Sequence, residues 1–379
     1  MSTHGDRRLR VVVLGLSLSS AWGNGHATTY RALLRAFSAR GHDVLFLERD
    51  VPWYAAHRDL AAPDYCRLAF YQACTDLETR WAEVIAGADA VILGSYVPEG
   101  VAVGDLVLGL ARGATAFYDI DTPITLAAMA RGETTYIAPR QVPRFDLYLS
   151  FTGGPTLAHI EQDLGSPAAR VLHCAVDAEA YRPIDIPSRW DLSYLGTYSP
   201  DRQPMLERLL LDPARRAPAL RFAVAGPQYP DHIAWPANVE RIEHVPPQDH
   251  AAFYGASRFT LNITRTDMLR AGYSPSVRLF EAAACATPIL TDRWTGLETV
   301  FAPGTEILAA SDAAEVLAVL CSLPETRRRA LGEAARRRVL AAHAARHRAA
   351  ELEAHLFAAL ARKAACSGTP CTALEATAG

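Results

Sequence analysis

Residues 274–292, SPSVRLFEAAACATPILTD, decide the fold expected of this 379-residue chain. Ser274 followed by Pro275 is typical of a helix start, because a serine oxygen caps first-turn amides and proline fits the first helical position. The helix is expected to end near Ala286, where a Thr-Pro pair stops it, and the apolar residues that follow predict a buried strand. A further strand is predicted at residues 259–263, so the unit is the strand, helix, strand repeat of a parallel sheet.

Two charged side chains, Arg278 and Glu281, stand three residues apart on this otherwise apolar helix. Their spacing allows an intrahelical ion pair that stabilises the helix by roughly 0.2–0.5 kcal/mol. The alternative is a ligand site, because the preceding loop carries Arg265 and Arg270, and arginines beside a helix N-terminus attract a diphosphate. The glutamate could then accept hydrogen bonds from ribose hydroxyls. Spacing alone leaves both alternatives open.

Length and composition predict a soluble protein with two domains. The chain is too long for one ordinary core, and domains of about 150–200 residues are the default. No apolar run approaches the roughly 18 residues that span a bilayer, and the N-terminus lacks the apolar core of a signal peptide, so a cytoplasmic location is predicted. The seven cysteines lack the paired spacing of a zinc or redox motif, which predicts reduced thiols and no structural metal.

The charge distribution bears on possible partners. A formal net charge of −3 gives no reason to expect nucleic-acid binding. Basic clusters at residues 327–329 and 336–338 are typical of the solvated face of a helix, and they leave a weak membrane-surface contact open.

The N-terminal half alternates strands and helices. A β-branched run at residues 10–16 predicts a central strand buried on both faces, followed by a helix near residues 27–39 and a strand at residues 44–48. The glycines before this helix do not form the dinucleotide fingerprint, which weakens a nicotinamide-binding interpretation. Residues 66–87 are predicted to be helical. Further strands are expected at residues 90–94, 114–118 and 147–151.

Polar loops follow two of these strands, GSYVPEG at residues 94–100 and YDIDTP at residues 118–123. Ligands of open parallel sheets bind at the carboxyl ends of strands, so both are candidate site loops. Asp119 and Asp121 also form a D-x-D triplet of the kind that holds a cation, but such triplets are common by chance and no metal site is predicted. Both aspartates could instead cap the following helix.

The C-terminal half repeats the same alternation after a proline-rich linker at residues 181–190. The predicted domains span residues 1–180 and 191–363, the second ending in a long helix, and residues 364–379 are predicted to be a disordered tail. The expected fold class is α/β, with two Rossmann-like halves of parallel sheet.

The run SVRLFEAAACATPILTDRWTGLETVFAPGTEIL and a basic helix containing RRRVLAAH resemble the CgeB-like (spore-maturation type) glycosyltransferases of the GT-B superfamily. This likeness covers most of residues 190–350, and the N-terminal segments GNGHATTYRALL and YDIDTP are similar to those of bacterial GT-B-like proteins of the same layout. The resemblance implies the GT-B fold, in which two Rossmann-like domains face a cleft. It also implies that the C-terminal domain holds most of the nucleotide of a nucleotide-sugar.

By this resemblance, Glu281 matches the glutamate of an F-E-A motif that binds the nucleotide ribose, and three arginines lie where cations meet the donor phosphates. The donor-binding residues implied are Glu281, Arg278, Arg265, Arg202 and Ser276. Many retaining members carry a second glutamate eight residues before the first, and here that position is Tyr273. The E-x7-E pair is therefore absent. Ala286 stands where the family usually has glycine.

The expected function is metal-independent, hexosyltransferase-like transfer of a sugar from a nucleotide-sugar to an unknown acceptor, which could be a glycan, a lipid, a protein or a small molecule. The nucleotide-sugar is a co-substrate, and no cofactor is expected. Arginines and helix amides would stabilise the leaving diphosphate. The alternatives are a nucleotide-sugar epimerase on the same fold and a catalytically silent nucleotide-binding protein.

Inverting transfer also needs a base on the N-terminal side of the cleft. The candidates are Asp121, His26 and Asp119. His26 could instead form only a loop hydrogen bond. Glu99 is a weaker candidate, because a glutamate in a turn is usually solvated.

Overall fold

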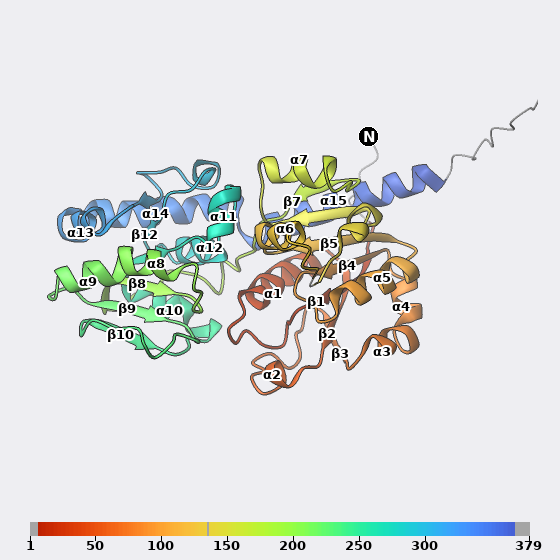
Figure 1. Ribbon diagram of the computed structural model, residues 1–379, viewed down its shortest axis with the longest axis horizontal. Coiled ribbons are helices and arrows are strands. Elements are labelled where there is room, and N and C mark those ends of the chain that lie inside the picture. Colours follow the sequence, from red (N-terminus) through yellow and green to blue (C-terminus); the bar gives the residue numbers. More distant parts are fainter. Residues whose placement is uncertain (1–6, 135, 368–379) are drawn as a thin grey trace, which may run out of the picture.

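The computed structural model describes residues 7–134 and 136–367, which form two α/β domains side by side (Figure 1). The N-terminal sheet has the strand order β3-β2-β1-β4-β5-β6-β7, and each neighbouring pair is parallel. Its strands are β1 (Arg10–Gly15), β2 (Asp43–Arg49), β3 (Arg67–Tyr71), β4 (Ala90–Gly94), β5 (Ala114–Asp119), β6 (Leu147–Ser150) and β7 (Ala169–Val171). The helices of this domain are α1 (Gly25–Ser38), α2 (Pro52–Ala55), α3 (Cys74–Thr79), α4 (Ala82–Ala86), α5 (Gly100–Leu110), α6 (Thr122–Ala130) and α7 (Pro155–Gln162).

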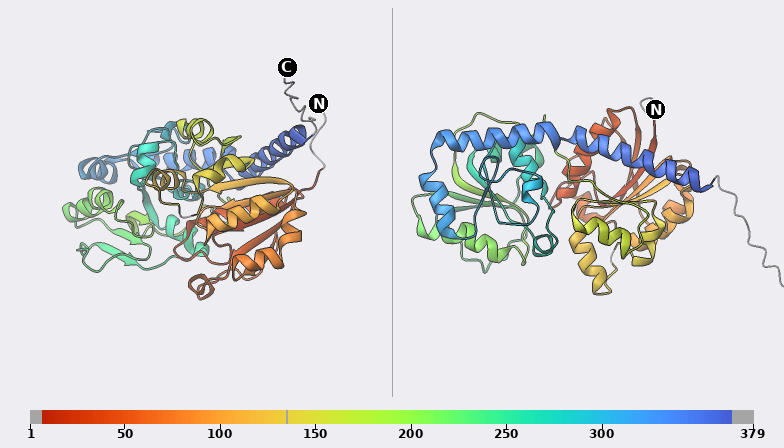
Figure 2. Two further views of the ribbon diagram at one scale, coloured as in Figure 1. Left: turned by 45° about the vertical axis from the view of Figure 1, so that its right-hand side comes forward. Right: turned by 90° about the horizontal axis from the view of Figure 1, so that it is seen from above.

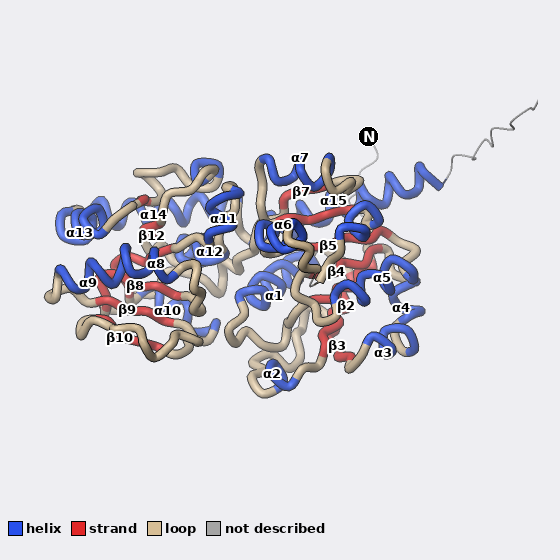
Figure 3. The backbone as a smooth tube through the Cα atoms, in the orientation of Figure 1, coloured by secondary structure: helices blue, strands red, loops and turns tan. Residues whose placement is uncertain are grey.

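The C-terminal sheet has the order β10-β9-β8-β11-β12-β13 and is also parallel throughout. Its strands are β8 (Trp190–Leu195), β9 (Phe222–Ala225), β10 (Val239–Ile242), β11 (Ser257–Asn262), β12 (Ile289–Thr291) and β13 (Leu308–Ala309). The helices are α8 (Gln203–Leu206), α9 (Asp212–Arg216), α10 (His250–Gly255), α11 (Thr266–Ala271), α12 (Val277–Ala284), α13 (Ala313–Ser322), α14 (Glu325–Ala342) and α15 (Ala345–Ser367). Figure 3 shows the helices lying on both sides of the strands. Short 3-10 or π turns occupy Pro139–Arg144, Glu207–Leu211, Pro247–Asp249 and Leu297–Thr299.

The predicted strand, helix, strand unit is confirmed as β11, α12 and β12, with β11 and β12 paired in parallel. The helix begins later than predicted, because Ser276 rather than Ser274 is the N-cap and accepts a hydrogen bond from Arg278 N at 3.3 Å. It ends at Ala284, before Ala286 adopts a left-handed φ of 56°. That conformation favours glycine, which explains why the resembling family usually has glycine there.

The prediction of a helix over residues 66–87 is wrong for its first part, which forms the edge strand β3. This strand has five residues at the edge of the sheet and only Tyr71 among them is buried, so its strand signal is weaker than that of the buried central strands. The tail predicted to be disordered lies mostly outside the described residues, and residues 364–367 continue α15.

The two C-terminal helices connect the domains. α14 packs on α12 of the C-terminal domain, whereas α15 packs on α1, β5 and β6 of the N-terminal domain, although the predicted boundaries group it with the other domain. Figure 2 shows the pair crossing both domains in blue. Where α15 begins, Ala345 N donates to Val176 O at 2.9 Å. The segment in which the chain leaves the N-terminal domain therefore lies beside the one in which it returns. Among the described residues, no helix has the length and apolar character needed to cross a membrane.

Candidate functional site

A cleft of about 490 Å³ lies between the domains, at the carboxyl ends of the strands of both sheets. It receives His26 and Asp121 from the N-terminal domain. The residues from the C-terminal domain are Arg202, Arg265, Ser276, Arg278 and Glu281. The structure thus brings together the five predicted donor-binding residues and two of the candidate bases, but not Asp119.

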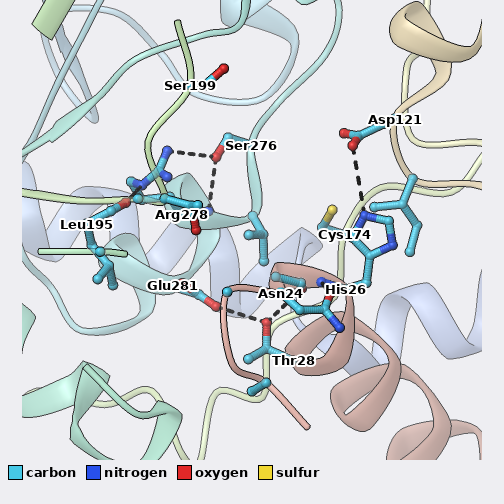
Figure 4. Close-up of a pocket in the computed structure, with 18 of the residues that line it drawn as sticks. Asn24, His26, Thr28, Asp121, Cys174, Leu195, Ser199, Ser276, Arg278 and Glu281 are labelled. Carbon is cyan, nitrogen blue, oxygen red and sulfur yellow. Dashed lines mark hydrogen bonds and ion pairs between the residues drawn. The ribbon is translucent and has the colours of Figure 1, made fainter. Parts of the chain in front are cut away.

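Arg278 is held at the start of α12 by contacts with the strands beneath it. Its Nε donates to Leu195 O and its Nη1 donates to Asn262 Oδ1 at 3.3 Å, while the guanidinium lies 5.0 Å from the ring centroid of Tyr194. It forms no ion pair with Glu281, so the intrahelical pair allowed by their spacing is absent between these two described side chains. Figure 4 shows the two groups pointing to different parts of the cleft.

Glu281 is a buried carboxylate, 4% exposed, with only long contacts. It accepts from Thr28 Oγ1 at 3.4 Å, across the cleft (Figure 4). It also accepts from Tyr254 OH at 3.3 Å, and His250 Nδ1 lies 3.9 Å away. Burial, and then the charge of Glu281, raise the pKa of Tyr254 well above its usual value, so this hydroxyl stays a donor. A desolvated carboxylate with such weak partners gains by accepting shorter hydrogen bonds from a ligand.

Two further arginines line the cleft, and each has one buried donor without a hydrogen-bond partner. Arg202 Nη2 donates to Thr197 O at 2.6 Å, but its Nε is buried without a hydrogen-bond partner. Arg265 lies 3.8 Å from Asp121 Oδ2 and 3.6 Å from Asp201 Oδ2, and its Nε also lacks a hydrogen-bond partner. Unpaired buried donors are costly, so both groups favour an anionic ligand.

His26 and Asp121 face each other on the opposite wall, with 3.9 Å between His26 Nε2 and Asp121 Oδ2 (Figure 4). The start of α1 fixes His26, since Asn24 caps the helix by accepting from His26 N at 2.9 Å. Burial by itself raises the pKa of Asp121, but the nearby imidazole of His26, together with Arg265 and Tyr96, outweighs it and lowers that pKa. Asp121 therefore stays ionised beside the imidazole.

Asp119 does not line the cleft, contrary to its place among the candidate bases. It is fully buried at the end of β5 and accepts from Tyr148 OH at 2.6 Å and from Thr125 Oγ1 at 2.9 Å. Burial raises its pKa to about 6, although these hydrogen bonds oppose the shift. Asp119 thus supports the loop that presents Asp121.

Several other residues lie differently from their predicted roles. Glu99 is exposed and pairs with Arg49, and Arg270 is exposed and pairs with Asp267 at 3.0 Å. Neither lines the cleft. Among the described residues there is no group of three or more His, Cys, Asp or Glu side chains placed to hold a metal ion, so the D-x-D triplet gathers no further ligands.

Sequence reasoning missed Thr28, Tyr254, His250 and Asp201, which surround the predicted charges. The first three contact Glu281 from α1 and α10, and Asp201 meets Arg265 from the loop after β8. None has a motif of its own, so only the fold reveals their roles.

Comparison with known proteins indicates the class of enzyme to which the chain is similar. Residues 202–354 match a sequence family described as "Glycosyl transferase-like". No curated protein sequence matches the chain significantly.

Solved structures share the fold at low identity. Sucrose-phosphate synthase from Thermosynechococcus elongatus has a TM-score of 0.67 and 16% identity, with 93% of this chain and 100% of that chain covered. Anabaena HepE, solved with UDP and glucose, has a TM-score of 0.67, 11% identity and the same coverages. AviGT4, a glycosyltransferase involved in avilamycin A biosynthesis, has a TM-score of 0.63 and 17% identity, with 93% and 98% covered. The predicted GT-B fold and glycosyltransferase class are confirmed, and the narrower CgeB-like assignment stays a prediction.

The pKa of Asp119 gives a prediction about stability. Its pKa of about 6 in the fold exceeds the ordinary 3.8, so the folded state binds the proton more tightly. The stability contributed by the protonated group is present below pH 4 and is lost as the pH rises through 6, a change of about 3 kcal/mol. Relative to Asp119→Asn, the wild type should lose this free energy of unfolding between pH 4 and pH 7, measured by urea denaturation. A difference between the two proteins that stays constant with pH would contradict the assignment.

Proposed function

We propose that the protein transfers a sugar from a uridine diphosphate sugar to a hydroxyl acceptor in the interdomain cleft. The observation that carries this proposal is the convergence of three arginines, the N-terminus of α12 and buried Glu281 on one wall, opposite His26 and Asp121 on the other. HepE and an alpha-glucosyltransferase, which share the fold, were both solved with UDP. These structures support the choice of uridine as the nucleoside of the proposed donor.

The phosphates are placed at the arginine end of this wall. The N-terminus of α12 carries a partial positive charge, and Ser276 and Arg278 lie at that terminus. Arg202 and Arg265 add charge-assisted donors that have no other hydrogen bond at Nε. As the bond between the anomeric carbon and the diphosphate breaks, these groups stabilise the charge that develops on the leaving oxygen.

The ribose is placed on Glu281, one turn along α12. Its carboxylate already accepts a hydroxyl, that of Thr28, at a long 3.4 Å. The ribose hydroxyls would take that place with shorter bonds, which also removes the contact that spans the domains. Donor binding is thereby linked to the position of α1.

His26 is proposed as the base and Asp121 as the group that orients and stabilises its protonated form. Their separation of 3.9 Å is longer than a hydrogen bond, as is common in unliganded sites. In the step, the acceptor oxygen bonds to the anomeric carbon, the diphosphate leaves, and the acceptor proton passes to His26. A protein base of this kind is required by a single displacement with inversion, consistent with Tyr273 in place of a second glutamate.

Sugar transfer is expected to continue in EDTA, because in this proposal arginine side chains, and not a metal ion, bind the diphosphate. The measurement is release of UDP from UDP-glucose before and after chelation. Loss of turnover that Mg²⁺ or Mn²⁺ restores would contradict metal independence and would make Asp121 a candidate ligand.

Glu281→Gln should weaken UDP binding by about tenfold to a hundredfold, since the loss of charge-assisted hydrogen bonds costs roughly 1.5–3 kcal/mol. Calorimetric titration with UDP and 2′-deoxy-UDP isolates the ribose contact. The wild type should prefer the ribose form, and the variant should lose most of that preference while its melting temperature shows that it remains folded. Glu298→Gln, at an exposed position, is the control. An unchanged preference would remove Glu281 from the ribose site.

His26→Ala should lower kcat by about 10²–10⁴-fold, the usual contribution of a general base, and should affect UDP binding far less. Asp121→Asn should act in the same direction. Exposed His159→Ala is the matched control. A large loss of UDP affinity with kcat preserved would contradict the assignment, as would NMR evidence that the product retains the anomeric configuration of the donor.

A further inference from the structure

Three aromatic side chains, Trp22, Trp53 and His57, form a cluster beside the cleft, here called the aromatic platform. Trp22 stacks on His57 with ring centroids 4.5 Å apart and planes at 8°, and the edge of Trp53 meets Trp22 at 4.8 Å. His244, which lines the cleft from the C-terminal domain, lies 6.4 Å from Trp22. Tyr54, adjacent to Trp53 in α2, also lines the cleft. The platform therefore adjoins residues that line the cleft.

The platform lies on the acceptor side of that site. Trp22 stands four residues before His26, in the loop between β1 and α1. Trp53 belongs to α2, which Figure 1 shows at the lower edge of the N-terminal domain. Trp53 is 52% exposed, more than any other large apolar side chain among residues 7–134 and 136–367. One exposed apolar side chain is ordinary on a protein surface, but here it adjoins two further aromatic rings next to the cleft.

A buried polar network holds the loop that carries Trp22. The carboxylate of Glu48, at the end of β2, is fully buried and accepts from Leu18 N at 2.7 Å and from Ser19 N at 2.9 Å. The hydroxyls of Ser17 and Ser19 donate to its other oxygen at 3.1 and 2.6 Å. Burying a carboxylate is costly, and a fully hydrogen-bonded one fixes the geometry around it.

The same loop is joined to the segment that follows α2. Ser20 Oγ donates to His57 O at 2.8 Å, and Ala21 N donates to Asp59 Oδ1 at 3.2 Å. Asp59 in turn pairs with Arg31 of α1 at 2.5 Å. Trp22 and His57 are thus positioned before any ligand arrives, which lowers the entropy lost on binding.

Charges around the platform are paired. Arg58 meets Asp50 at 2.6 Å, Arg31 meets Asp59, and the carboxylate of Glu48 is satisfied by hydrogen bonds, so both arginines beside the platform are already paired. This differs from the arginine end of the cleft and favours a ligand without net charge. An uncharged ligand that offers both an apolar face and hydroxyl groups matches a sugar ring, whose C–H face packs on an aromatic ring while its hydroxyls reach polar neighbours.

We propose that the aromatic platform binds the acceptor and that the acceptor is a neutral saccharide. The inference rests on the proposed function, because it places the acceptor hydroxyl beside His26. One sugar ring packs against the exposed indole of Trp53 at the cleft mouth, while the next reaches the pair formed by His26 and Asp121. Trp53 then acts in acceptor recognition, at a distance from the donor wall.

The test is titration of the full chain, saturated with UDP, with maltose and with the methyl glycosides of glucose, mannose and N-acetylglucosamine, observed by saturation-transfer NMR and calorimetry. UDP binding is measured first in each sample. At least one saccharide should bind, and Trp53→Ala should weaken it about tenfold, whereas Trp53→Phe should retain most of the affinity. Ile184→Ala, 39% exposed, is the control for loss of a surface apolar group.

The outcomes separate the two proposals. If UDP binds but no saccharide does, or if Trp53→Ala leaves saccharide affinity unchanged, the platform is not the saccharide site. If a DNA duplex or a phosphorylated sugar binds instead, and its binding is lost in Trp53→Ala, the neutral-saccharide assignment is overturned. Failure of UDP itself to bind would overturn the proposed function, and the acceptor role would be lost with it.

Discussion

The site depends on the orientation of two parallel sheets, each of which presents the carboxyl ends of its strands to the same cleft. In a parallel sheet every strand ends at the same edge, so loops far apart in the sequence meet there. The loops after β1 and β5 bring His26 to Asp121, and the loops after β8 and β11 bring Arg202 to Arg265. α15 helps to fix the relation of the two edges, because it continues from the C-terminal domain onto the N-terminal one. The arrangement of the strands therefore determines which side chains can meet in the cleft, and individual contacts then fix their geometry.

The sequence could predict the elements with strong local signals and the charges that end near the cleft. The apolar runs of the central strands and the α12 unit were sufficient for the fold class, whereas the short edge strand β3, in which only Tyr71 is buried, gave a weaker signal. Helical spacing suggested an ion pair between Arg278 and Glu281, but the carbonyl of Leu195 at the end of β8 binds the arginine instead. Asp119 and Asp121 looked equivalent in sequence. Only packing shows that Tyr148 binds the first and leaves the second to the cleft.

The position of the missing second glutamate has a structural use in this chain. Tyr273 has a left-handed φ of 49°, and its backbone oxygen accepts from Gly153 N of the other domain at 3.0 Å. Its ring covers Gly154 and Gly296, where a Cβ would lie within 2.5 Å of ring atoms. The nearby hydroxyls of Thr152 and Ser274, 2.8 Å apart, add a second link between the domains. Tyr273 therefore helps to join the domains, and the proposed base lies on the N-terminal wall of the cleft.

The most direct measurement of the central claim is a crystal structure of the protein with UDP. The account predicts that the diphosphate lies between the N-terminus of α12 and Arg202, and that the ribose hydroxyls are within hydrogen-bonding distance of Glu281, replacing Thr28. UDP bound outside the interdomain cleft, or bound within it while Glu281 keeps only Thr28 and Tyr254 as partners, would contradict the account.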